Sequence, residues 1–303
     1  MFRSLTLFRL PPAAAANLGD LETILADHKL RDVGPMELST QGFVSPFGTE
    51  EGQAMVHSVG PYTLIHVGHQ KRMLPTSVIN AEVRKRCDKI LAEEQRKVGG
   101  KERKRMKDEV INDLIPRAFI SEGRQPFYID TKKGWVVLDS SSRKAAEGAI
   151  SALREALGTF PAVPATPEEH PRALLTNWLA TGQLPDGLAL GEEVEMKDAG
   201  DGGGATIRAK NQDLQVDEIR DHLKAGKQVT QLALVWNDRL SFTLGEDLSV
   251  RKFKYLDVVL NESANNSDSA ESALDSDFTL LTLEADKLIE KLVEWFKIEP
   301  VTD

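Results

Sequence analysis

Residues 76–116 limit the folds open to this 303-residue chain more than any other segment. Apolar residues recur at helical spacing over 76–98 and again over 101–115, and Gly99-Gly100 interrupts the pattern. Apolar side chains three to four residues apart are typical of a helix with one buried stripe. The segment therefore predicts two helices that pack as an antiparallel hairpin around a glycine turn. Each stripe is narrow, so we expect the hairpin to project from the body of the protein.

Outside this segment, short apolar or alternating runs predict strands, and helical patterns are interspersed with them. Strands are expected at 2–10, 42–47, 61–69, 126–131, 134–139, 205–210, 228–236, 239–244, 249–255 and 277–283. Helices are expected from residue 17 or 20 to 30, from 141 or 142 to 157, at 174–179, at 216–223 and from Leu288 to Phe296. The acidic residues 261–275 predict a loop, and Asn237-Asp238 predicts a turn between strands. Because regular βαβ alternation is missing, the predicted class is α+β with mixed or antiparallel sheets.

Three prolines mark the clearest boundary in the sequence. Pro161, Pro164 and Pro167 follow a predicted helix and precede a second series of strands. Prolines clustered between patterned segments are typical of a linker. We therefore expect three regions: a central α+β region of residues 1–75 plus 117–160, a basic helical-hairpin tip of residues 76–116, and a C-terminal α+β base of residues 161–303.

The composition excludes several classes of protein. Cys87 is the single cysteine, which excludes a disulfide within the chain and argues against a cysteine-based zinc site. Arg9 and the prolines after it break the apolar start of the chain, so we expect a strand and a loop there rather than a secretory signal. No window reaches the roughly 20 apolar residues that a membrane span needs. We therefore expect a cytoplasmic protein without membrane partners.

The sequence predicts no catalytic or metal site. His66 and His69 form an HxxH pair, but a three-residue step along a strand places them on opposite faces. The glycines at 200–204 lack a nucleotide-binding spacing, and residues 99–105 lack the strand–loop–helix context of a phosphate loop. Cys87 lies on the apolar face of the first hairpin helix, which favours packing over reactivity. We expect neither an enzyme nor a cofactor.

Charge is strongly segregated along the chain. The formal net charge is −9 at pH 7. Residues 71–117 contain fourteen Lys and Arg against eight Asp and Glu, which gives +6 there and −15 for the remainder. The basic residues of the expected hairpin are Arg84, Lys85, Arg86, Lys89, Arg96, Lys97, Lys101, Arg103, Lys104, Arg105 and Lys107.

Two interpretations of this basic run are open. A basic hairpin on an acidic body is a candidate clamp for nucleic-acid phosphates, which it would bind without reading sequence. A charge run is also typical of a solvated helix face with ion pairs one turn apart, such as Glu82 with Arg86. Taken alone, the run favours the solvated face.

Several long stretches are too specific to recur by chance. They are MLPTSVIN at 73–80, KDEVINDLIPRAF at 107–119, YIDT and GWVVLD within 128–139, ALREALGTFPAVP at 152–164, IRAKNQDL at 207–214, HLKAGKQVTQLALVWNDRLSF at 222–242 and DSDFTLLT at 275–282. These stretches resemble the bacterial recombination-associated RdgC family, and the resemblance runs nearly from end to end.

The resemblance implies a nucleoid-associated protein that binds DNA with little or no sequence specificity. It implies crescent-shaped subunits that close into a ring-shaped homodimer with duplex DNA in the central hole, and it leaves binding of single strands open. The implied activity is a limit on RecA-promoted strand exchange, with a link to replication restart. The hairpin would then be the tip of the crescent, and its basic residues would line or gate the hole.

The candidate DNA-binding residues outside the hairpin are Arg117, Phe119, Arg208, Lys210 and Gln212. Phe119 lies where the tip would meet the body, either as a core anchor or as an aromatic that faces an interface or DNA. A second tract contains Arg208, Lys210 and Gln212 and is expected near the end of a strand. Its residues would either contact phosphates or be exposed polar side chains. Family members often carry a second basic residue where this chain has Asn211, so this tract supplies less charge than usual.

Two other functions fit parts of the same pattern. The basic hairpin of a protein–protein adaptor would dock an acidic recombination or replication partner. A metal-dependent nuclease would use scattered carboxylates, although none of them shows a recognisable catalytic spacing.

Overall fold

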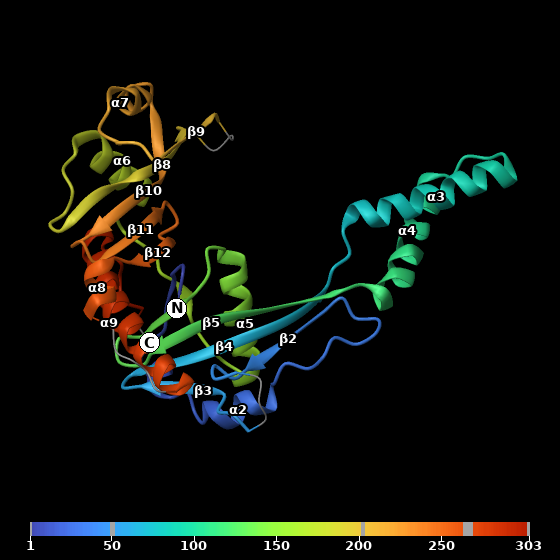
Figure 1. The fold of residues 1–303 in the computed structure, drawn as a ribbon, viewed down its shortest axis with the longest axis horizontal. Coiled ribbons are helices and arrows are strands. Elements are labelled where there is room, and N and C mark those ends of the chain that lie inside the picture. The colour runs from blue at the N-terminus through green and yellow to red at the C-terminus, as the bar shows by residue number, and fades with distance from the viewer. Residues whose placement is uncertain (1, 49–51, 201–203, 263–268, 302–303) are drawn as a thin grey trace. The chain divides into compact units, whose positions relative to one another are not determined.

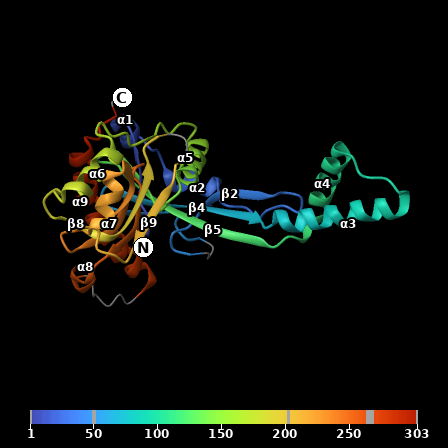
Figure 2. The ribbon, with the colours of Figure 1, turned by 90° about the horizontal axis from the view of Figure 1, so that it is seen from above.

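The computed structural model describes residues 2–48, 52–200, 204–262 and 269–301 (Figures 1 and 2). Its helices are α1 (Pro12–Ala16), α2 (Leu21–Asp27), α3 (Thr76–Glu94), α4 (Gly100–Leu114), the 3-10 helix η1 (Ile115–Arg117), α5 (Arg143–Leu157), α6 (Pro171–Thr181), α7 (Asp217–Lys224), α8 (Asp257–Glu262) and α9 (Ala270–Phe296). Its strands are β1 (Thr6–Arg9), β2 (Ser39–Val44), β3 (Val56–Val59), β4 (Tyr62–Arg72), β5 (Ile120–Asp130), β6 (Trp135–Leu138), β7 (Val163–Pro164), β8 (Leu188–Asp198), β9 (Thr206–Lys210), β10 (Lys227–Trp236), β11 (Leu240–Gly245) and β12 (Val250–Tyr255).

The chain divides into two compact units. Unit 1 consists of Met1–Ile24, Ser45–His66 and Gln125–Asp303, and unit 2 consists of Leu25–Val44 and Val67–Arg124. Unit 2 contains the whole segment that was predicted as a helical tip, together with β2 and parts of β4 and β5. The division into three regions stays a prediction.

Seven strands form one sheet in the order β2-β4-β5-β6-β1-β7, and β3 pairs with β4. β5 and β6 pair antiparallel, as β1 and β6 do, so the strands predicted at 126–131 and 134–139 are confirmed and form a hairpin. Its turn is held by Asp130, whose carboxylate accepts hydrogen bonds from the backbone N–H groups of Lys132 and Lys133 at 2.9 and 3.0 Å. Gly134 follows with φ of +66°, a conformation that glycine adopts without steric cost.

Five strands of unit 1 form a second, antiparallel sheet in the order β12-β11-β10-β8-β9. The three strands predicted at 228–255 are confirmed as β10, β11 and β12. Asn237 and Asp238 connect the first two, with φ of 49° and 52°. Positive φ at both central residues is the geometry of the tightest hairpin turns, which Asn and Asp tolerate better than other residues.

One continuous apolar cluster forms the core of unit 1. It includes Tyr128 and Val137 from the seven-stranded sheet, Leu232 and Leu244 from the five-stranded sheet, and Phe296 from α9. Helix α6 also packs its buried face into this cluster. The combination of helices with antiparallel sheets confirms the α+β class.

The strand predicted at 277–283 is wrong, because these residues belong to α9. Phe278, Leu281 and Ala285 are buried at spacings of three and four residues, which continues the helical stripe of the C-terminus. Thr282 donates to the backbone oxygen of Phe278 at 3.0 Å, so its hydroxyl is satisfied inside the helix. The β-branched and aromatic composition of this segment was outweighed by burial of one helical face.

The predicted loop at 261–275 is also shorter than expected. Residues 261–262 end α8, and 270–275 begin α9 with the hydroxyl of Ser269 accepting from the backbone N–H of Ser272 at 3.1 Å. Residues 263–268 lie outside the described part of the chain. Strands β3 and β8 have no counterpart in the sequence prediction, and α1 lies in the expected N-terminal loop.

The two predicted helices of residues 76–116 are present as α3 and α4, with a different connection. Gln95 ends α3 with φ of 53°, and Gly99-Gly100 begin α4 rather than forming the turn. In Figures 1 and 2, α4 crosses α3 at a wide angle instead of running back alongside it. The expected antiparallel arrangement is therefore corrected to a crossed pair, which we call the helix pair.

Candidate nucleic-acid interface

A small apolar cluster holds the helix pair together. Ile79 and Val83 from α3 pack against Met106 and Val110 from α4. Cys87 is half-buried beside this cluster, and its thiol lies 3.8 Å from the sulfur of Met106. These positions confirm the packing role expected for Cys87. Because the cluster occupies only the crossing, most of the surface of both helices is exposed.

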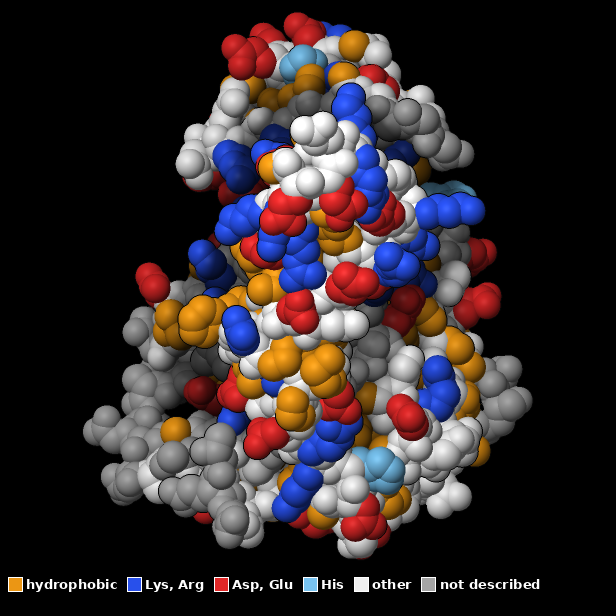
Figure 3. Space-filling view, turned by 90° about the vertical axis from the view of Figure 1, so that its right-hand side faces the viewer, with side chains coloured by type: hydrophobic (Ala, Val, Ile, Leu, Met, Phe, Trp, Pro, Cys, Tyr) orange, Lys and Arg blue, Asp and Glu red, His pale blue; other side chains and the backbone are white. Residues whose placement is uncertain are grey.

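Four cations of α4 are exposed and make no side-chain ion pair or hydrogen bond with any residue that the structure describes. We call them the α4 cations: Lys101, Arg103, Lys104 and Lys107. Arg84, Lys97 and Arg117 have the same character on α3, on the connection between the helices and on η1. In Figure 3, blue side chains gather over the helix pair with red ones between them.

The remaining cations of the helix pair have acidic partners. Lys85 lies 3.5 Å from Glu82, Lys89 lies 3.9 Å from Glu93 and Arg105 lies 3.6 Å from Glu109. Arg86 donates to Asp113 at 2.6 Å and joins the two helices. Arg96 binds Glu94 and Glu102 at 2.6 and 2.7 Å. The ion pairs that the solvated-face interpretation expects are thus present in this subset, and the α4 cations lack them among the described residues.

Hydrogen bonding also shifts the titration of the Arg96 cluster. Hydrogen bonds to Glu102 and then Glu94 raise the pKa of Arg96 above its ordinary value, and the same contact lowers the pKa of Glu102. The Arg96 ion pair therefore joins the segment between α3 and α4 to the first turn of α4.

Phe119 is 80% exposed, which rules out the core-anchor alternative and agrees with the alternative of an outward-facing aromatic. Its backbone oxygen accepts from the N–H of Met73 at 2.8 Å, while the N–H of Arg72 donates to the oxygen of Leu38 at 2.8 Å. These bonds place three exposed apolar side chains on adjacent backbone segments. The exposed large apolar residues of unit 2 are Met36, Leu38, Met73, Val78, Leu91, Phe119 and Ile120.

The second predicted tract lies on the five-stranded sheet of unit 1. Arg208 is exposed on β9 and binds Glu195 of β8 at 2.6 Å. Lys210 is exposed and, within the described ranges, its side chain has neither an ion pair nor a hydrogen bond. The side-chain amide of Gln212 donates to Glu218 at 3.3 Å. In this tract, Arg208 is therefore paired with a carboxylate, and Lys210 is an exposed cation that a ligand could bind.

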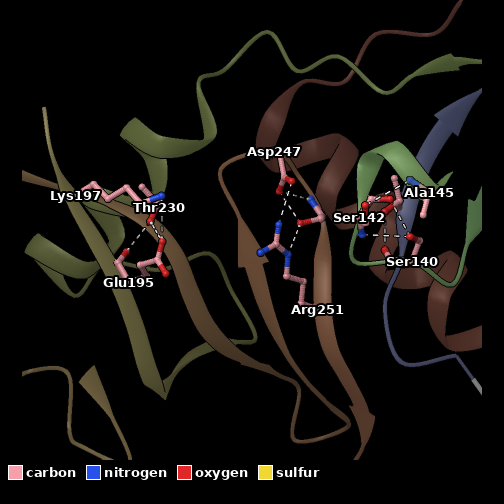
Figure 4. A network of polar contacts seen from close by, with 10 residues as sticks. Ser140, Ser142, Ala145, Glu195, Lys197, Thr230, Asp247 and Arg251 are labelled. Carbon is pink, nitrogen blue, oxygen red and sulfur yellow. Dashed lines mark hydrogen bonds and ion pairs between the residues drawn. The ribbon is translucent and has the colours of Figure 1, made fainter. Parts of the chain in front are cut away.

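Glu195 is a buried carboxylate at the centre of this tract (Figure 4). Thr230 donates to its Oε1 at 3.1 Å, and Lys197 lies 3.3 Å away. Burial alone would raise the pKa of Glu195, but hydrogen bonds from Arg208, Lys197 and Thr230 outweigh it and lower the pKa. Glu195 is therefore held as an anion.

Sequence reasoning missed Lys252 and Glu193, which lie beside this tract and pair with each other. The signal was present in VRKFKY at 250–255, where two consecutive basic residues break the alternation of a half-buried strand. Such a break is typical of a β-bulge.

The sequence predicts no catalytic or metal site. His66 and His69, the HxxH pair, both lie on β4, and a strand was expected there. In the part of the chain that the structure describes, no three His, Cys, Asp or Glu side chains gather in a way that could hold a metal ion. None of the described helices has the length and apolar character required to cross a membrane.

The fold and its charged surfaces define an α+β protein that exposes cations on a helix pair and on one sheet. A family model described as "Putative exonuclease, RdgC" matches residues 1–299. The recombination-associated protein RdgC of Xanthomonas campestris pv. campestris is 43% identical over 298 residues, which cover 98% of each chain. Those of Xanthomonas oryzae pv. oryzae and Stenotrophomonas maltophilia are 44% and 42% identical over 95% and 98% of each chain. The chain belongs to the RdgC family.

Proposed function

We propose that this protein binds DNA through its phosphates, without reading sequence, as a homodimer that closes into a ring around the duplex. Binding would limit RecA-promoted recombination on the nucleoid in the cytoplasm and would take part in replication restart. The α4 cations are the observation that carries the proposal. The name of the relatives, recombination-associated protein, supports a recombination context.

The position of the α4 cations strengthens the argument from their charge. Lys101, Arg103 and Lys104 lie in the first turns of a 15-residue helix, where the backbone dipole already places partial positive charge. Cations there repel the helix terminus, so they do not serve the stability of α4. A phosphate backbone would relieve this repulsion and release counterions. Binding to phosphate is sequence-independent, because every nucleotide carries the same group.

The exposed apolar residues of unit 2 support the homodimer. Monomeric proteins rarely expose large apolar side chains on adjacent segments, and such patches mark protein–protein contacts. Leu38, Met73 and Phe119 form such a set. A second copy of the chain would bury the same residues from both sides, as a two-fold contact requires.

The experiment compares two triple variants that remove the same charge from the helix pair. In the first, Lys101, Lys104 and Lys107 become Gln, and in the second Lys85, Lys89 and Arg105 become Gln. Each residue of the second set has a carboxylate within 4 Å, so phosphate must compete for it. We expect the first variant to lower the slope of log affinity against log salt by about 3 and the second by clearly less.

Wild-type protein that fails to bind duplex at low salt would refute the proposal. Equal slopes for both variants would place the phosphate contacts elsewhere. A cellular complex that survives nuclease treatment and is lost in the first variant would favour the adaptor. We expect end-labelled duplex to stay intact with Mg²⁺ or Mn²⁺, and shortening from the ends would instead favour the exonuclease named by the family model.

A further inference from the structure

The open face of the five-stranded sheet carries a hollow of about 190 Å³. Residues from all five strands line it: Glu193, Val194, Glu195, Arg208, Ala209, Lys210, Gln231, Thr243 and Lys252. Val194 and Ala209 pack toward the core of unit 1, so the polar side chains form the accessible lining. Three cations and two carboxylates therefore surround one small depression.

Lys252 reaches the hollow because of a β-bulge. Between the pairs Ser241–Lys254 and Thr243–Arg251, one residue of β11 faces two residues of β12. Lys252 is the first of these two and has φ of 51°. The left-handed region costs a residue with a β-carbon on the order of 1 kcal/mol, and bulges commonly redirect a side chain toward a site. The bulge also keeps Phe253 and Tyr255, which follow Arg251 and Lys252, on the buried face of β12.

The Lys252 ammonium donates to the carboxylate of Glu193. The two residues belong to β12 and β8, and the strand order places β11 and β10 between them. The pair therefore spans the hollow above Gln231 and Thr243, which line it from the two intervening strands.

The two carboxylates of the hollow have different roles. Glu195 is buried and held by three donors, including Arg208 at 2.6 Å. The side chain of Glu193 is 30% exposed, and Lys252 is its one ion-pair partner among the described residues. An exposed single pair contributes little stability, so an incoming anion can displace Glu193 but not Glu195.

We propose that this hollow is a seat for a backbone phosphate of bound nucleic acid, which displaces Glu193 from Lys252 and is then held by Lys252 and Lys210. Arg208 stays on Glu195 and fixes the wall of the seat. Glu193 thus weakens binding by occupying the cation when DNA is absent. The inference rests on the proposed DNA binding and adds a second contact surface to it.

The test uses two substitutions with opposite expected effects. Lys252→Gly removes the ammonium and favours the same positive φ, so the bulge is retained. It should lower the salt slope of duplex binding by about 1. Glu193→Gln frees Lys252 and should tighten binding by up to about fivefold. Lys254→Gln and Glu192→Gln are matched controls, since both residues are exposed neighbours outside the hollow.

Circular dichroism melting verifies that each variant is folded. Wild-type protein that does not bind duplex overturns the proposed function and this seat together. If wild type binds duplex, but Lys252→Gly and Glu193→Gln bind it in the same way as their control variants, the phosphate seat alone is overturned. Inorganic phosphate is a separate probe, measured by calorimetry without DNA. Saturation below about 1 mM that depends on Lys252 would assign the hollow to free phosphate and overturn the nucleic-acid seat.

Discussion

Charged side chains in this protein fall into two groups that differ in what surrounds them. Glu284 on α9 is 2% exposed, and its carboxylate accepts from Arg239 at 2.8 and 3.2 Å and from Lys287 at 3.0 Å. Lys101 on α4 has no such partner in the described structure. Buried charges of the first group hold elements together, because an isolated ion there would be costly. Exposed charges of the second group remain available to a ligand.

Glu284→Gln should therefore destabilise unit 1 by about 1.5–3 kcal/mol, the range for a hydrogen bond to a charged group. Glu294→Gln on the same helix is the control. Glu294 is exposed and binds Lys291 at 2.7 Å, so the expected loss is within about 0.5 kcal/mol. Denaturant unfolding of both variants checks the difference. Equal losses would show that the Arg239 contact does not stabilise the fold.

The same carboxylate predicts a pH dependence. Burial acts to raise the pKa of Glu284, but hydrogen bonds from Arg239 and Lys287 lower it below the ordinary value of 4.5. A carboxyl with a lowered pKa in the folded state stabilises the protein above its unfolded pKa. That contribution is lost as the pH falls below 4.5 through the lower folded value. The loss should be smaller in Glu284→Gln than in wild type, measured as unfolding free energy from pH 7 to pH 3.

At the scale of elements, the helix pair depends on a very small core. Ile79, Val83, Met106 and Val110 are its buried members, and the rest of each helix is supported by local hydrogen bonds and ion pairs. In proteins most of the stability of a helix comes from the packing of its apolar face rather than from helix propensity. The crossing should therefore decide the local stability of both helices.

Val110→Ala should reduce the local stability of α3 and α4 by about 2 kcal/mol, because it removes two buried methyl groups and leaves a cavity. Val78→Ala is the matched control on α3, where the valine is 48% exposed. Native-state hydrogen exchange is the measurement. Amides of α3 and α4 should lose protection in Val110→Ala alone, while those of β10 stay unchanged. Uniform loss across unit 1 would contradict an independent role for this core.

At the scale of the whole molecule, the charge of the chain is a poor guide to its partner. A net charge of −9 argues against DNA, yet residues 71–117 carry +6 and several of their cations have no ion-pair partner in the described structure. Acidic residues elsewhere would discourage non-specific binding to other polyanions. The exposed apolar set around Phe119 lies in unit 2 with these cations. We therefore place the proposed self-association and the proposed DNA contacts in the same unit.

Phe119→Ser should raise the dimer dissociation constant at least about tenfold, since large exposed aromatics dominate interface energies. Analytical ultracentrifugation checks this, with Leu283→Ser as a control at an exposed leucine of α9.

A closed ring also predicts that wild type stays on covalently closed circular DNA after a high-salt wash and slides off linear DNA. Phe119→Ser should lose that retention. A variant that remains dimeric would place the contact elsewhere.

The sequence alone determined the features that depend on neighbouring residues. The class, the helices at 76–116, the Asn237-Asp238 turn and the segregation of charge are all visible in spacing and composition, because a local pattern is enough to produce them. It failed at 277–283, where a β-like composition was overridden by a buried helical face. It also left two interpretations of the charge run open, since spacing cannot show which cations find a carboxylate.

Only the tertiary structure decided which charged groups are held and which are available. The crossing of α3 and α4 gives Arg86 a partner in Asp113 and leaves the α4 cations exposed. The strand order brings Lys252 to Glu193, 59 residues away, over the hollow of the five-stranded sheet. Ion pairing depends on distances of a few ångströms between segments far apart in the chain, and folding alone sets those distances.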